Sequence, residues 1–290
     1  MIRVQDLSFK RGGKEILSKL NFQAAAGEIS VILGKNGAGK STVLNCLCGN
    51  FNDYEGTINW DGQDLKNFSL KEQAKRRAVL AQSMELSFQL SVYDVIEMGC
   101  YGQYDRFSSK ERRQLIEEVA NQFQLSSFLD RDFLSLSGGE KKRVLLAKCL
   151  IQLKVGAITE KRQYLLLDEP TAALDLEQQN LLLQFIKELV RKEGLGVIAV
   201  LHDLNLAAQL ADQLILLKQG KVHTCGSPEQ VLQPAIIQDV FDIDCLIQRH
   251  PSLDCPLITT LPYAERNSTF APATGPTQGD RTPLTHPAAS

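Results

Sequence analysis

Residues 34–41 read Gly34-Lys35-Asn36-Gly37-Ala38-Gly39-Lys40-Ser41, and Thr42 follows. This spacing fits a phosphate-binding loop, in which glycines let backbone N–H groups turn inward around a polyphosphate. An apolar, β-branched run precedes it and predicts a buried strand, and residues 41–48 after it predict a helix. A glycine-rich turn that matched by chance would lack this context. The stretch therefore predicts a nucleoside triphosphate site, with Lys40 reaching the β- and γ-phosphates and Ser41 ligating Mg²⁺.

The bulk composition is that of an ordinary globular protein. The 290 residues are 43% apolar and 23% charged, and the formal net charge is -2. No excess of positive charge marks the chain as a nucleic-acid binder. No apolar run approaches the roughly 20 residues that a membrane-spanning helix needs, so we expect membrane attachment only through a partner. The seven cysteines include no CxxC pair, which favours reduced thiols in a cytosolic protein.

Apolar runs and helical repeats alternate along the chain. Residues 1–26 alternate in the β manner and predict antiparallel strands. Residues 92–153 have helical spacing, whereas 164–167 and 197–201 are typical of buried strands. Alternating strands and helices predict an α/β fold with a mostly parallel sheet covered on both faces. From about residue 264 the chain is rich in Pro, Thr, Ala and Ser, which predicts a disordered tail.

Two adjacent carboxylates follow the buried strand at residues 164–167. Asp168 is expected at the carboxyl edge of the sheet, beside the phosphate loop, where it can hold Mg²⁺. Glu169 can orient and deprotonate the attacking water, a role worth about 10²–10⁴ in rate. The structural alternative is that one of these acids only caps the next helix. A phosphate loop in the same sheet favours the catalytic interpretation.

Two further stretches carry weaker signals of their own. His202 ends another buried strand and can contact the γ-phosphate, although a lone histidine at a strand end is more often structural. Ser137, Gly138, Gly139 and Glu140 open a helix and predict a second anion site. They lie more than 90 residues from the phosphate loop, so we expect a second subunit to present them. The alternative is a capped helix after a flexible Gly-Gly turn.

Together these motifs resemble those of ABC-type ATPase subunits over roughly residues 1–255. Gln82 stands at the family's glutamine-loop position, Asp175 ends the D-loop motif, and all the motifs follow the family's order. The resemblance implies a P-loop NTPase cassette of the α/β class. It implies a mostly parallel core sheet, an N-terminal antiparallel β subdomain, and a helical subdomain inserted at about residues 84–157. Residues 256–290 would form the Pro/Thr/Ala-rich tail.

The resemblance also assigns roles to single residues. It implies ATP hydrolysis with Glu169 and His202 as catalytic residues, and Mg²⁺ held by Ser41, Gln82 and Asp168. It implies a head-to-tail homodimer, in which ATP lies between one subunit's phosphate loop and the partner's Ser137 region.

Two positions depart from the family's pattern. Arg11 stands where an aromatic residue often stacks on adenine; an arginine plane can also stack on a base, and Phe9 is near in the sequence. Glu140 stands where glutamine is commonest, a change that we expect to be tolerated.

Within the family, the chain is most similar to ATPases that power import of iron chelates and cobalamin. Residues 77–83 and 200–208 are of that type, and Arg11 and the polar loop before Tyr164 look most like those of hemin-import ATPases. This resemblance implies a peripheral protein on the cytoplasmic face of the inner membrane. Its partners would be a permease dimer and, indirectly, a periplasmic hemin-binding protein. Ferric siderophore and cobalamin remain alternative cargoes.

A soluble ABC protein acting on DNA or on the ribosome is the main competing hypothesis. DNA-repair members carry long coiled coils between the two halves of the cassette, whereas Gln82 and Ser137 are only 55 positions apart. Translation-type members carry two cassettes, whereas this sequence has one phosphate loop. Both comparisons favour a transport subunit with no nucleic-acid partner.

Overall fold

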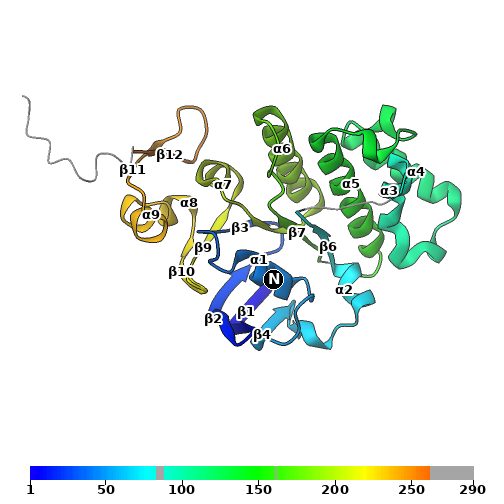
Figure 1. Ribbon diagram of the computed structural model, residues 1–290. Coiled ribbons are helices and arrows are strands. Elements are labelled where there is room, and N and C mark those ends of the chain that lie inside the picture. The colour runs from blue at the N-terminus through cyan, green and yellow to red at the C-terminus, as the bar shows by residue number, and fades with distance from the viewer. Residues whose placement is uncertain (83–87, 161, 262–290) are drawn as a thin grey trace, which may run out of the picture.

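The computed structural model describes residues 1–82, 88–160 and 162–261 (Figure 1). Within these ranges a six-stranded sheet has the order β10-β9-β3-β8-β7-β6, and all neighbours run parallel except β10, which is antiparallel to β9. The central strands are buried on both faces, which explains their continuous apolar runs. The strands are β3 (Ile29–Gly34), β6 (Arg77–Leu80), β7 (Tyr164–Asp168), β8 (Gly196–Val200), β9 (Gln213–Lys218) and β10 (Lys221–Gly226).

A second, antiparallel sheet packs against this core, as the alternating N-terminal pattern predicts. Its order is β2-β1-β4-β5, and Figure 1 shows its blue strands below the core sheet. Helix α1 (Lys40–Leu47) lies between the two sheets and shares one apolar core with both of them. The strands are β1 (Ile2–Arg11), β2 (Lys14–Ala24), β4 (Glu55–Trp60) and β5 (Gln63–Asp64).

Helices cover the other face of the core sheet. The apolar side of α6 (Leu176–Glu193) packs against the strands, and α7 (Leu204–Leu210) packs beside β3. Between β4 and β6, the short elements η1 (Leu65–Asn67) and α2 (Leu70–Arg76) connect the two sheets.

The described residues between β6 and β7 form helices, which Figure 1 shows in green on the right. Residues 83–87, at the start of the predicted insert, lie outside the described residues. The longest helix, α5, runs back to the sheet and packs against β6. The helices are α3 (Val92–Glu97), η2 (Met98–Arg106), α4 (Ser109–Gln122), η3 (Ser126–Phe128), η4 (Phe133–Ser135) and α5 (Gly138–Gly156).

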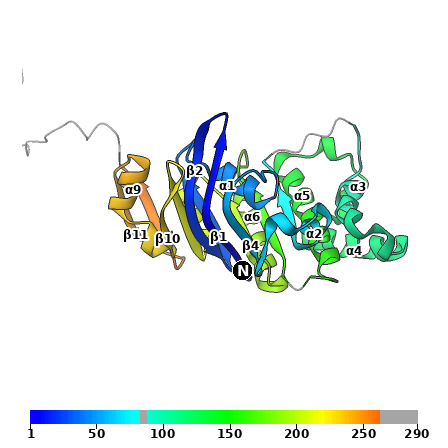
Figure 2. The ribbon, with the colours of Figure 1, turned by 90° about the horizontal axis from the view of Figure 1, so that it is seen from below.

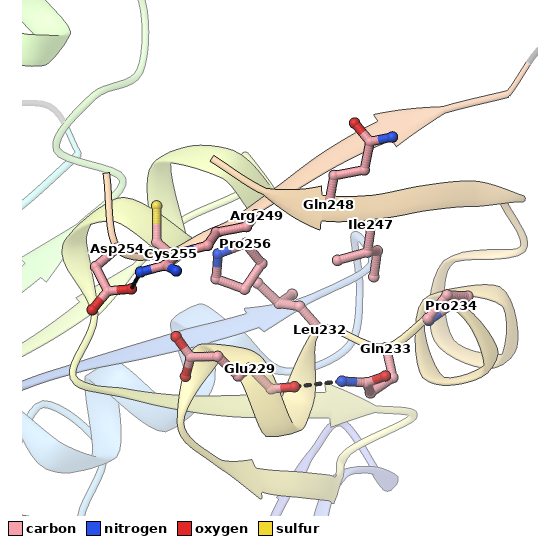
Figure 3. Close-up of a pocket in the computed structure, with 10 residues that line it drawn as sticks. All are labelled: Glu229, Leu232, Gln233, Pro234, Ile247, Gln248, Arg249, Asp254, Cys255 and Pro256. Atoms are coloured by element: carbon pink, nitrogen blue, oxygen red, sulfur yellow. Dashed lines mark hydrogen bonds and ion pairs between the residues drawn. The ribbon is translucent and has the colours of Figure 1, made fainter. Parts of the chain in front are cut away.

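The last described elements lie at the opposite side of the molecule from the helical segment (Figure 2). A hairpin of two strands packs against α7 there, and beneath it lies an open cavity of about 570 Å³ with Leu232 and Pro256 in its lining (Figure 3). The elements are α8 (Pro228–Val231), α9 (Pro234–Phe241), β11 (Cys245–Arg249) and β12 (Pro256–Thr260).

This hairpin corrects the start of the predicted tail, which was placed at residue 256. Residues 256–260 form β12, because they pair with β11 and because buried Ile258 exchanges two hydrogen bonds with Asn205. The composition of the segment gives no sign of this strand. Residues 262–290 of the predicted tail lie outside the described residues.

In the part of the chain that the structure describes, every helix is too short or too polar to cross a membrane.

Candidate functional site

The phosphate loop connects the end of β3 to the start of α1. Gly34 and Gly39 have φ angles of 151° and 102°. A Cβ atom at Gly34 would collide with the Leu217 carbonyl oxygen, and one at Gly39 would collide with the Leu17 side chain. Only glycine fits these positions without strain. The predicted loop residues 34–42 therefore run from the last residue of β3, through a turn at residues 35–39, into the first turn of α1.

Lys40, the first residue of α1, is nearly buried and turns into this loop. Its ammonium donates hydrogen bonds to the carbonyl oxygens of Gly34 (2.8 Å) and Lys35 (3.1 Å). Burial lowers the pKa of Lys40, while the charges of Glu169 and Asp168 act in the opposite direction. The structure thus places the lysine of the loop within the field of the two predicted carboxylates.

Asp168 and Glu169 lie at the carboxyl end of β7, next in the sheet to β8. Burial and the neighbouring Glu169 raise the pKa of Asp168. Its Oδ1 atom is buried and has no hydrogen-bond partner among the described residues. An unpartnered carboxylate oxygen beside a phosphate loop is a suitable ligand for a hard cation.

The carboxylate of Glu169 is held by two predicted site residues. Its Oε2 accepts a hydrogen bond from Gln82 Nε2 (2.8 Å), and its Oε1 lies 2.5 Å from His202 Nε2. Gln82, Glu169 and His202 follow β6, β7 and β8, which are neighbours in the sheet. The parallel order therefore brings together three residues that lie far apart in the sequence.

Ser137 caps α5 with a reciprocal pair of hydrogen bonds. Its hydroxyl accepts from the Glu140 N–H (3.3 Å), and the Glu140 carboxylate accepts from the Ser137 N–H (2.7 Å). Asp175 caps α6 in a similar way by accepting from Gln178 N (2.9 Å). The two caps lie next to each other. A Cβ atom at Gly138 would be 3.9 Å from Leu174, and one at Gly139 would collide with Gln178.

The Ser137 region stays apart from the phosphate loop of its own chain. No hydrogen bond or ion pair joins residues 137–140 to residues 34–42 in the described ranges. Ser137 and Gly138 are exposed at the helix start. The Ser137 N–H is already bonded to Glu140, whereas the exposed start of α5 and its dipole can attract an anion from outside the chain.

Arg11 lies at the end of β1 in a stack of side chains. Its guanidinium carbon is 5.8 Å from the centre of the Phe51 ring, and Phe51 stacks on Phe9 at 4.9 Å with an interplanar angle of 5°. The sequence hypothesis named Arg11 and Phe9 and missed Phe51. No local pattern marks Phe51, because the stack forms only when β1 and the segment before β4 come together.

Two charged residues near the site were also missed. Asp242, which ends α9, forms an ion pair with Lys35 of the phosphate loop (2.7 Å). Lys142 of α5 donates a hydrogen bond to the Gln82 carbonyl oxygen (2.9 Å). Both contacts join distant segments, so sequence spacing gives no sign of them.

Comparison with known proteins gives a consistent picture. The family model for ABC transporters matches residues 17–172. The hemin import ATP-binding protein HmuV of Deinococcus radiodurans is 45% identical over 259 residues, which are 89% of this chain and 97% of that protein. The protein of the same name from Pseudomonas aeruginosa is 43% identical over 89% of this chain and 99% of its own length. A bacterial ABC transporter cassette solved as a dimer is 26% identical with a TM-score of 0.67, covering 78% of this chain and 98% of that one.

Proposed function

Since the chain belongs to the ABC transporter family, we propose that it is the ATP-hydrolysing subunit of an importer whose cargo is hemin. The observation that carries hydrolysis is the Glu169 carboxylate, held by Gln82 and His202 beside the phosphate loop. The cargo rests on the hemin import proteins that match nearly the whole chain.

The phosphate loop and Lys40 bind the triphosphate. Loop N–H groups and the start of α1 face the β- and γ-phosphates, and Lys40 exchanges its loop carbonyl partners for phosphate oxygens. Ser41, Gln82 and the unpartnered Oδ1 of Asp168 fit the oxygen ligands that Mg²⁺ prefers. The role of the metal, when bound, is to neutralise charge on the phosphate oxygens. Arg11, whose guanidinium lies over the Phe51 ring, would supply a flat cation to stack on the adenine.

Glu169 acts as the general base for the attacking water. The water oxygen forms a bond to the γ-phosphorus, the bond to the β–γ bridging oxygen breaks, and ADP leaves with that electron pair. Glu169 receives the water's proton on one carboxylate oxygen. His202 and Gln82 keep the carboxylate aimed at the γ-phosphate, and His202 also donates to a γ-phosphate oxygen.

A head-to-tail homodimer completes each site. The exposed start of α5 at Ser137–Glu140 would meet the γ-phosphate on the partner subunit, and Asp175 would lie at the same interface. The ABC transporter cassette with the same fold that is solved as a dimer supports the pairing of two subunits.

The dimer would work on the cytoplasmic face of the inner membrane with a permease dimer, which a periplasmic hemin-binding protein would load. Ferric siderophore and cobalamin are the alternative cargoes, since they share the large chelate character of hemin. A role on nucleic acid is disfavoured by the net charge of -2.

The test is the ATPase activity of this subunit reconstituted with its co-purifying permease in lipid vesicles. Binding proteins loaded with hemin, ferric siderophore or cobalamin are added one at a time, with unloaded proteins as controls. We expect stimulation by the hemin-loaded protein only. Stimulation by another chelate would overturn the cargo, and failure of any permease to co-purify would overturn the transport function.

A further inference from the structure

The side chain of Lys142 extends from the helical segment to the catalytic carboxylates. It lies on α5, five positions after the capping residue Ser137, and it is partly buried. Its ammonium donates to the Gln82 carbonyl oxygen at 2.9 Å. Burial lowers the pKa of Lys142, while the charges of Asp168 and Glu169 raise it. The charges of both carboxylates therefore act on the Lys142 ammonium and favour its charged form.

Lys142 begins a continuous series of polar contacts that ends at His202. The Lys142 ammonium holds the backbone of Gln82, the Gln82 amide donates to Glu169 Oε2, and Glu169 Oε1 contacts His202. These four residues come from α5 and from the ends of three adjacent strands. Only Lys142 belongs to the helical segment between β6 and β7.

Lys142 and Lys40 approach the carboxylates from different elements and have different partners. Lys40 starts α1 and donates to the carbonyl oxygens of Gly34 and Lys35 inside the phosphate loop. Lys142 instead donates to the backbone of the residue whose side chain holds Glu169. The contact of Lys142 is therefore with the segment that holds Glu169, whereas the contacts of Lys40 are with the phosphate loop.

We propose that Lys142 is a positioning residue for hydrolysis, which acts through Gln82 to set the orientation of the Glu169 carboxylate. This inference rests on the proposed ATPase function. A movement of α5 relative to the core sheet changes the Lys142–Gln82 contact, so the helical segment acts on the base through this side chain. Because a small misplacement of a catalytic group lowers the rate steeply, the effect falls on turnover more than on binding.

The experiment compares Lys142→Gln, Lys142→Arg and the control Lys148→Gln. Lys148 lies on the same helix and, among the described residues, makes no hydrogen bond or ion pair with Gln82, Asp168 or Glu169, so Lys148→Gln matches the change in charge. ATPase kinetics give kcat and KM, and a fluorescent ATP analogue gives nucleotide affinity without turnover. Thermal unfolding verifies that each variant is folded.

We expect Lys142→Gln to lower kcat about tenfold while KM and analogue affinity stay within about twofold. Glutamine removes the charge and shortens the reach of the donor; Lys142→Arg, which keeps the charge and the reach, should recover most of the loss, and Lys148→Gln should match the wild type. In a double-mutant cycle with Gln82→Ala, the losses should be less than multiplicative, because both changes interrupt one series of contacts.

Any of the following kinetic results would overturn the proposal: an unchanged kcat in Lys142→Gln, an equal loss in Lys148→Gln, or independent effects in the cycle. A fall in analogue affinity equal to the fall in kcat would also overturn it, since Lys142 would then bind nucleotide. A wild-type protein without ATPase activity would overturn the proposed function itself, and the role of Lys142 with it.

Discussion

Glu169 has a φ of 48°, in the left-handed backbone region that costs a non-glycine residue roughly 1–2 kcal/mol. The conformation persists because the residue is fixed at several points. Its N–H donates to the Val200 carbonyl (3.1 Å), and its carboxylate contacts Gln82 and His202. These contacts thus stabilise a strained backbone at Glu169 and fix the orientation of its carboxylate.

At this scale, Glu169→Gln should bind ATP normally and turn over at least about a hundredfold more slowly, because the amide cannot accept the water's proton. With ATP bound and hydrolysis blocked, the variant should elute from a sizing column as a dimer. Glu177→Gln, an exposed change in the first turn of α6, serves as the control. Near wild-type turnover in Glu169→Gln would show that another group activates the water.

Asp168 offers a prediction in which stability and activity move in opposite directions. Its pKa is raised in the fold by burial and by Glu169, so the ionised form costs stability at any pH above its unfolded pKa of about 3.9. Asp168→Asn should therefore unfold at a higher temperature than the wild type at pH 7, and the gap should close as the pH falls toward 4. Its ATPase activity should drop by about a hundredfold or more. A lower melting temperature at pH 7 would contradict this account.

Among the elements, α5 has two features of interest, its start at Ser137 and the contact of Lys142 with Gln82, and only the first could be predicted from the sequence. The sequence predicts a helix start and an anion site at Ser137–Glu140, with a capped helix as the alternative; the structure confirms the helix and shows the cap. Lys142 was not predicted, because its contact with Gln82 depends on how α5 packs against β6.

Strands with continuous apolar runs and loops with fixed glycine spacing could be predicted, since local physics determines them. The β11–β12 hairpin and the Phe51 stack could not, since distant packing determines them.

Two helices provide a matched pair for testing the role of Ser137. Ser108 caps α4 with the same geometry, its hydroxyl accepting from Glu111 N (3.3 Å) and its N–H donating to Glu111 (2.7 Å). Alanine at either serine should cost about 1 kcal/mol of unfolding free energy. Only Ser137→Ala should also lower ATP turnover, by about tenfold or more. Equal activities in the two variants would mean that Ser137 is only a cap.

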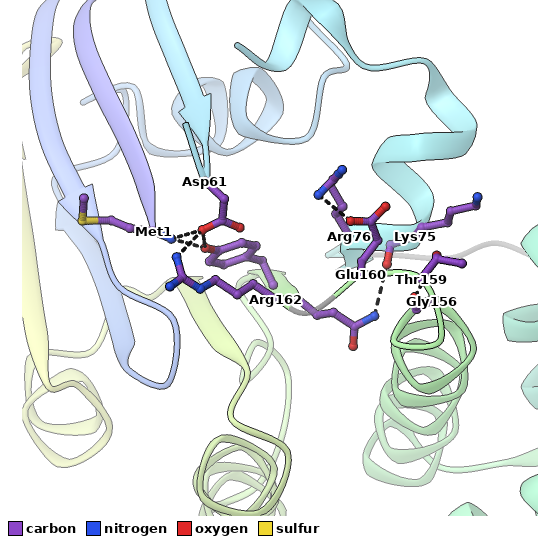
Figure 4. Close-up of polar contacts among 10 residues, drawn as sticks. Met1, Asp61, Lys75, Arg76, Gly156, Thr159, Glu160 and Arg162 are labelled. Atoms are coloured by element: carbon purple, nitrogen blue, oxygen red, sulfur yellow. Dashed lines mark hydrogen bonds and ion pairs between the residues drawn. The ribbon is translucent and has the colours of Figure 1, made fainter. Parts of the chain in front are cut away.

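Across the whole molecule, the antiparallel sheet is fastened to the core sheet at Asp61 (Figure 4). Its carboxylate accepts from Arg162 (2.9 Å) and from the Tyr164 hydroxyl (3.1 Å), and it contacts the amino group of Met1. Burial alone would raise the pKa of Asp61, but these partners outweigh it and hold the pKa below its usual value. One carboxylate therefore ties β4 to the start of β7.

The depressed pKa predicts how this junction responds to pH. The stabilisation is present above the unfolded pKa of about 3.9 and is lost as the pH falls through the folded value. Asp61→Asn should thus lower the unfolding free energy at pH 7 by about 1–2 kcal/mol, and the difference should shrink below pH 4. Asp254→Asn, which breaks an exposed pair with Arg249, should change it by less than about 0.5 kcal/mol. Denaturant titrations over a pH series measure both, and a pH-independent difference would refute the linkage.

The separation of Ser137 from the phosphate loop of its own chain has a genetic consequence. If each catalytic unit contains Glu169 of one copy and the α5 start of the other, a defect in the base and a defect in the α5 start can be placed in different copies. A mixed pair of Glu169→Gln and Ser137→Ala chains then carries both defects in one unit and leaves the other unit intact. Two alleles that are each impaired should therefore complement each other when co-expressed, whereas two alleles of the same kind should not.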